Sequence, residues 1–105
     1  MRIAEVIGTV TLSRPHPTLV GGRLLIAVPF SLKALERGGR PDGEDVISYD
    51  ELGAGHGARI GISEGREAAM PFHPDKKPLD AYCACILDSL AISDQPWRGA
   101  SEVAT

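Results

Sequence analysis

Apolar and polar residues alternate along the first part of the chain, which predicts a β-strand. The even positions from 4 to 12 are apolar or small, while polar residues occupy most odd positions. This is the pattern of a strand with one buried face, and we place it over residues 2–14. Prolines at 15 and 17 end the strand, because proline lacks an amide donor and restrains the residue before it to extended geometry.

Four further segments are predicted to be strands, at residues 23–28, 45–50, 59–63 and 80–88. The first and last of these are apolar at consecutive positions. A small all-β chain has few layers that could cover both faces of such a strand, so we expect one face to meet another subunit. The residues expected at this interface are Leu24, Leu25, Ile26, Tyr82, Cys83 and Ile86.

Two short helical turns are predicted between the strands. Residues 31–37 form the first, with Ser31 as its N-cap and Gly38 as its stop. The second covers residues 64–70 and ends at Pro71. Five short strands close most economically into a barrel, which removes exposed sheet edges. The predicted fold is therefore all-β: a small five-stranded, OB-like barrel.

The domain is expected to cover residues 1–92, and the composition changes after that point. From residue 93 to residue 105 the chain is small or polar apart from Trp97. Such a segment has little apolar surface to bury, so we expect a flexible C-terminal tail.

A glycine-rich run, Leu52-Gly53-Ala54-Gly55-His56-Gly57, connects the third and fourth predicted strands; we call it the glycine turn. Phosphate loops need glycines that open a helix, because the helix N-terminus supplies free amide groups. Here a strand follows, so the run is interpreted as a tight turn at or near a subunit contact. We expect a β-branched side chain at Gly55 to disrupt assembly, because it resists positive φ and blocks close backbone approach. His56 either faces a symmetry axis or is an exposed turn residue.

Composition argues against several classes of function. Eleven basic and fourteen acidic residues give a net charge of −3, and the five aromatic residues are scattered, which is unlike nucleic-acid binders. No segment reaches the roughly 20 apolar residues that span a bilayer. The chain also begins without a signal-peptide pattern, so we expect a cytoplasmic protein that contacts no membrane. Cys83 and Cys85 are expected to be unpaired thiols of a reducing compartment.

No motif in the chain points to catalysis, to a cofactor or to a metal. None of the serines lies in a nucleophile-elbow pattern. His16 and His73 lie in separate loops, whereas structural zinc sites use closely spaced ligand pairs. The acidic pairs at residues 44–45 and 50–51 flank strands, where solvated charge is the ordinary explanation. We therefore expect no enzyme activity.

Several short motifs together resemble the EutN/CcmL family of microcompartment vertex proteins. They occur in the family's order, over about residues 1–90: Val6-Ile7-Gly8-Thr9-Val10, Pro17-Thr18-Leu19-Val20-Gly21, Leu24-Leu25-Ile26, Asp50-Glu51-Leu52-Gly53-Ala54-Gly55-His56-Gly57, and Pro78-Leu79-Asp80-Ala81 with Asp88. Ala58 departs from the family pattern, which usually has an acidic residue after the glycine turn. The segment from Ser31 to Gly43 is also longer than usual.

The resemblance implies a shell protein with no catalytic activity that assembles as a cyclic homopentamer. Such pentamers close the icosahedral vertices of a bacterial microcompartment beside hexameric and pseudohexameric shell proteins. Apolar residues on both faces of two strands agree with this, because a ring buries different faces of each copy. The alternative is a small OB-like barrel that binds single-stranded nucleic acid or a small ligand.

Overall fold

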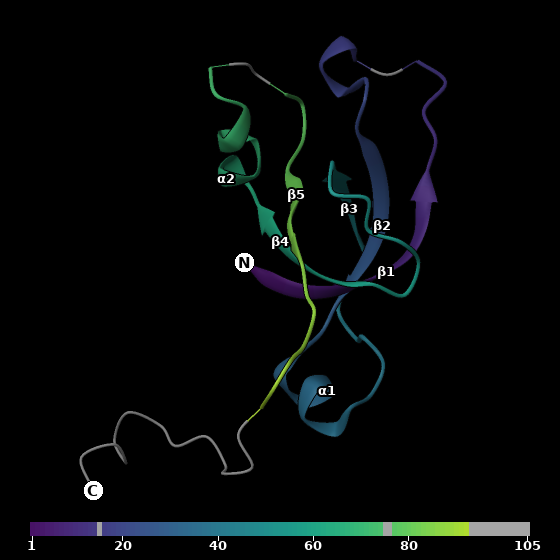
Figure 1. The fold of residues 1–105 in the computed structure, drawn as a ribbon, viewed down its shortest axis with the longest axis vertical. Helices are drawn as coiled ribbons and strands as arrows, with labels where there is room; N and C mark the ends of the chain where they lie inside the picture. Colours follow the sequence, from purple (N-terminus) through teal and green to yellow (C-terminus); the bar gives the residue numbers. More distant parts are fainter. Residues whose placement is uncertain (15, 75–76, 93–105) are drawn as a thin grey trace, which may run out of the picture.

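Five strands pair edge to edge until the sheet closes on itself (Figure 1). The structure is a computed structural model that describes residues 1–14, 16–74 and 77–92. The strands pair in the order β1-β2-β3-β5-β4, and β4 pairs again with β1. This confirms the predicted five-stranded barrel. The strand bounds are β1 (Arg2–Val10), β2 (Arg23–Pro29), β3 (Val46–Asp50), β4 (Arg59–Glu64) and β5 (Ala81–Ile86).

Alternation along each strand places one set of side chains in the core of the barrel. In β2, Leu25 and Ala27 are buried, whereas Leu24 and Ile26 are only half-buried. The two sets therefore point to opposite faces of the strand. The buried cluster consists of Ala4, Val6, Leu25, Ala27, Ala54, Ile60, Ile62 and Cys83. Apolar residues between the buried ones lie on the outer surface of the barrel.

Strand β1 is shorter than predicted, and it contains a bulge. It ends at Val10 rather than at Arg14. Its register against β2 shifts between Val6 and Gly8, so that Ile7 is the extra residue. Alternation alone could not locate either feature, because it continues in sequence to position 12 although the backbone pairing stops.

The short helices are α1 (Leu32–Arg37) and α2 (Arg66–Ala69), with 3-10 turns η1 (Pro17–Leu19) and η2 (Met70–Phe72). The prediction for α1 is confirmed. The hydroxyl of Ser31 accepts a hydrogen bond from the N–H of Ala34, and Gly38 follows at φ 62°. The prediction that Pro71 ends the second helix was wrong. It lies inside η2, where its fixed φ suits the first turn and its missing N–H costs no hydrogen bond.

The connecting segments gather at two opposite ends of the barrel (Figure 1). The loop after β1, which contains η1, and the segment from α2 to β5 lie at one end. Helix α1 projects from the other end. The predicted tail, residues 93–105, lies outside the described residues. None of the helices in the described ranges is long and apolar enough to cross a membrane.

Candidate functional site

Asp50 ends β3 and fixes the start of the glycine turn. Its side chain is 1% exposed, and its carboxylate accepts hydrogen bonds from the backbone N–H groups of Leu52, Gly53 and Ala54, each 3.0 Å long. An aspartate that binds N–H groups a few residues ahead replaces the backbone partner that a turn would otherwise need. The prediction of solvated charge at residues 50–51 was therefore wrong for Asp50, while Glu51 is exposed.

Hydrogen bonds to two other strands fix the rest of the turn. At the start of β2, the Nη2 atom of Arg23 donates to the carbonyl oxygen of Ala54 at 2.6 Å and lies 4.0 Å from the Asp50 carboxylate. The N–H of Gly57 donates to the carbonyl oxygen of Val6 at 2.8 Å. These bonds join the turn to β1, β2 and β3. The glycine turn is thus a well-ordered part of the barrel surface rather than a loose hairpin.

Two of its glycines occupy backbone conformations that favour glycine. Gly53 and Gly57 both have φ 84°, whereas Gly55 does not have a positive φ, and no described atom lies within 4 Å of a Cβ built on it. The stated reason for a disruptive substitution at Gly55 was therefore wrong. The steric requirement for glycine lies at Gly53 and Gly57.

The residues after Gly55 separate into an exposed group and a packed one. His56 is exposed in the single chain, which is compatible with both interpretations. Ala58 is partly buried and packs against the core cluster. A carboxylate at this position would lose water by contacting apolar side chains, and the alanine avoids that cost.

The six predicted interface residues fall into two sets. Leu25 and Cys83 are 0% exposed and belong to the barrel core, where they cannot reach a neighbouring chain. Their place in the interface set is therefore withdrawn, because strand alternation turns them inward. The other four lie on the outer surface, half-buried or exposed: Leu24, Ile26, Tyr82 and Ile86. Of the six predicted residues, these four remain candidates for subunit contact.

Large apolar side chains are also exposed outside these strands. Among the described residues, Val20, Met70 and Leu32 are more than half exposed. Val20 precedes β2, Met70 follows α2, and Leu32 begins α1. Single exposed apolar residues are normal, and these three lie on segments at the two ends of the barrel (Figure 1).

The side chains that could bind a metal or act as a nucleophile are few. No group of three or more potential metal ligands lies together in the described part of the chain. Cys83 and Cys85 are free thiols. Burial, followed by the nearby carboxylate of Asp50, raises the pKa of the Cys83 thiol to about 12. A thiol in that state is a packing group rather than a nucleophile.

Comparison with known proteins agrees with this architecture. The family model described as "Ethanolamine utilisation protein EutN/carboxysome" matches residues 1–88. The chain is 29% identical, over 91% of both chains, to the carboxysome shell vertex protein CcmL of Gloeobacter violaceus. It is 30% identical to the microcompartment shell vertex protein PduN of Salmonella typhimurium, over 87% of this chain and 99% of that one.

A solved structure extends the comparison to three dimensions. The pentameric microcompartment shell protein GrpN of Rhodospirillum rubrum superimposes with a TM-score of 0.73 at 28% identity, over 89% of this chain and 100% of that one. The barrel of this chain thus has the fold of a pentameric shell protein, and the relatives named above are structural shell proteins rather than enzymes. The chain belongs to the EutN/CcmL family.

Proposed function

We propose that this chain forms a cyclic homopentamer that occupies the vertices of a bacterial microcompartment shell in the cytoplasm. Residues 1–92 are the assembling domain. The observation that carries the proposal is the match of the whole barrel to a pentameric shell protein, which extends over all of that protein's chain. The relatives in carboxysomes and in other microcompartments are all shell vertex proteins, so the proposal does not depend on the cargo.

The outer surface of the barrel supports a ring. In a cyclic oligomer each copy contacts two neighbours through two different surfaces. The half-buried residues Leu24 and Ile26 lie on β2, and Tyr82 and Ile86 lie on β5. These strands are not paired with each other in the barrel. Strand β3 lies between them and adds Ile47, which is 43% exposed and pairs with Ile26. This part of the wall therefore carries apolar surface that a neighbouring copy would cover.

The glycine turn lies at or near the subunit contact in this proposal. Its hydrogen bonds to β1, β2 and β3 would hold it in one geometry in all five copies. Five copies of the exposed His56 would then be placed around the ring. The partners beyond the pentamer are hexameric and pseudohexameric shell proteins. We expect no nucleic-acid partner, because the net charge is −3.

The test is co-expression with the hexameric shell proteins of the same organism, followed by purification and negative-stain electron microscopy. With this chain present, closed polyhedra containing it in small amounts are expected. Without it, open or elongated assemblies are expected, because hexamers alone tile flat surfaces. Closed polyhedra that form equally well without the chain would contradict the proposal.

A further inference from the structure

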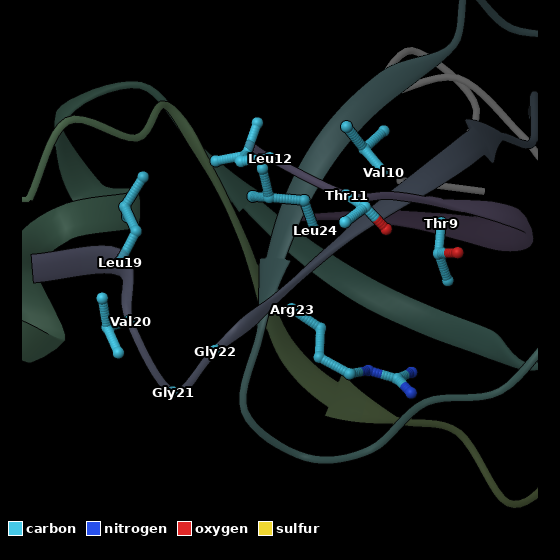
Figure 2. Close-up of a pocket in the computed structure, with 10 residues that line it drawn as sticks. All are labelled: Thr9, Val10, Thr11, Leu12, Leu19, Val20, Gly21, Gly22, Arg23 and Leu24. Carbon is cyan, nitrogen blue, oxygen red and sulfur yellow. The ribbon is translucent and has the colours of Figure 1, made fainter. Parts of the chain in front are cut away.

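A groove opens at the end of the barrel that carries η1, between the last residues of β1 and the segment that leads into β2 (Figure 2). Its volume is about 430 Å³. We call it the β1–β2 groove and define it by its five large apolar residues: Val10, Leu12, Leu19, Val20 and Leu24. Val20 is 70% exposed and Leu12 is 41% exposed. The groove therefore presents apolar surface that no described residue of the single chain covers.

Hydrogen bonds and packing hold the wall of the groove in place. The Nδ1 atom of His16 accepts a hydrogen bond from the N–H of Thr18, and the ammonium group of Lys77 donates to the carbonyl oxygen of Thr18. Lys77 also lies over the ring of Phe72, 4.5 Å from its centroid. The segment beside Leu19 is thereby fixed to the loop before β5, so the groove exists before any partner binds.

The opposite side of the same end of the barrel carries an exposed apolar side chain. Met70 begins η2, directly after α2, and is 62% exposed. Two residues on, Phe72 packs edge-on against Tyr49 and Tyr82, at centroid distances of 5.6 Å and 5.3 Å. This packing anchors η2 to the barrel wall. Figure 1 places α2 and the β1–β2 connection on opposite sides of this end of the barrel.

We propose that the β1–β2 groove of each copy receives the Met70 side chain of the next copy around the ring. The inference rests on the proposed cyclic pentamer and adds the contact surfaces. A ring requires two unlike surfaces that face opposite neighbours, and the β1–β2 connection that carries the groove lies across this end of the barrel from α2, which directly precedes the methionine. Methionine suits an irregular apolar groove, because its unbranched, polarisable side chain adapts to the available shape. The groove is incomplete without the neighbouring copy.

Another exposed apolar residue provides a matched control. Leu32 is 55% exposed at the start of α1, and Figure 1 places α1 at the opposite end of the barrel. A substitution of Leu32 removes a similar exposed apolar side chain far from the groove. Comparing it with the same substitution of Met70 separates a specific contact from a general effect of surface hydrophobicity.

The experiment is disulfide cross-linking between neighbouring copies of the full chain. All variants carry Cys85→Ser, which removes the more accessible native thiol. The test variant combines Val20→Cys with Met70→Cys, and the control combines Val20→Cys with Leu32→Cys. After mild oxidation, non-reducing gels of the test variant are expected to show a ladder that stops at five chains. Each single cysteine variant and the control are expected to stay monomeric on the gel.

Native mass spectrometry of the same samples separates the two levels of the proposal. A five-copy complex without a cross-linked ladder would overturn the Met70 contact and leave the pentamer standing. A wild-type chain without a five-copy complex would overturn both. Independently of cysteines, Met70→Glu is expected to weaken pentamer formation at least tenfold, while Leu32→Glu leaves it unchanged. A Met70→Glu pentamer that dissociates on dilution at the same concentration as the wild type would overturn the contact.

Discussion

Replacing Asp50 by alanine should destabilise the barrel more than removal of any exposed carboxylate. The change removes three hydrogen bonds of 3.0 Å from backbone N–H groups to a buried charged acceptor. Bonds to charged groups contribute about 1.5–3 kcal/mol each. Two of the three N–H groups are partly accessible and can bind water instead, whereas the N–H of Ala54 is buried and would be left without a partner. We expect a loss of about 3–5 kcal/mol.

The assay is urea unfolding followed by circular dichroism at one fixed protein concentration, because assembly makes apparent stability depend on concentration. Asp50→Asn keeps one carbonyl oxygen as an acceptor and should lose about half as much free energy of unfolding as Asp50→Ala. The neighbouring Glu51→Ala removes an exposed carboxylate and should change it by less than about 0.5 kcal/mol. A loss below about 1 kcal/mol for Asp50→Ala would refute the claim that this carboxylate holds the glycine turn.

Three further outcomes are expected. Gly22→Ala should lower the free energy of unfolding by at least about 1–3 kcal/mol, because the new Cβ would lie 2.1 Å from the ring of Tyr49. Gly55→Ala should leave it unchanged, and equal urea unfolding midpoints for the two variants would contradict this prediction. Iodoacetamide at about pH 8 should modify Cys83 only in denaturant, since its pKa of about 12 leaves almost no thiolate, and peptide mass mapping of native protein would reveal the opposite. Arg2, at the start of β1, donates a hydrogen bond to the Glu64 carboxylate and lowers its pKa below 4.5, so the contribution of Glu64 is present above pH 4.5 and is lost as pH falls through the lowered value. Glu64→Gln should therefore cost under about 1 kcal/mol at pH 7 and progressively less as pH falls below 4.5; a pH-independent difference in urea midpoint would count against this ion pair.

The strands were predictable because the physical cause of each one is local. Alternation located β1, and short apolar segments bounded by glycine, proline and polar residues located the other four strands, in each case to within a few residues. The α1 helix was predictable for the same reason, since Ser31 and Gly38 act on neighbouring backbone groups. Features that depend on pairing between strands, such as the bulge at Ile7, left no comparable signal in the sequence.

The inward and outward sets of an apolar strand were harder to separate. Leu24, Leu25 and Ile26 are all apolar, so composition gives no phase, and only the closed barrel shows that the middle residue is in the core. Cys83 was likewise predicted to lie at the interface because its strand is apolar on both faces, and the structure places it in the core. A strand that is apolar on both faces predicts that a partner exists, but it does not say which residues face that partner.

The role of Asp50 could have been found from sequence. An aspartate placed directly before a glycine-rich turn is positioned to bind the N–H groups that such a turn leaves free. Arg23 is different, because it lies 31 positions before its partner Ala54 and meets it only when β2 and β3 pair. Local chemistry indicated that a turn was present, whereas its attachment to β2 required the fold.

Native mass spectrometry of the purified full-length chain tests the central claim most directly. At micromolar concentration the account predicts a dominant species of five times the 11.1 kDa chain mass, which dissociates into chains of intact mass when activated. A chain that stays monomeric or dimeric over the accessible concentration range, with no five-copy species, would contradict the proposal that this barrel is a vertex pentamer.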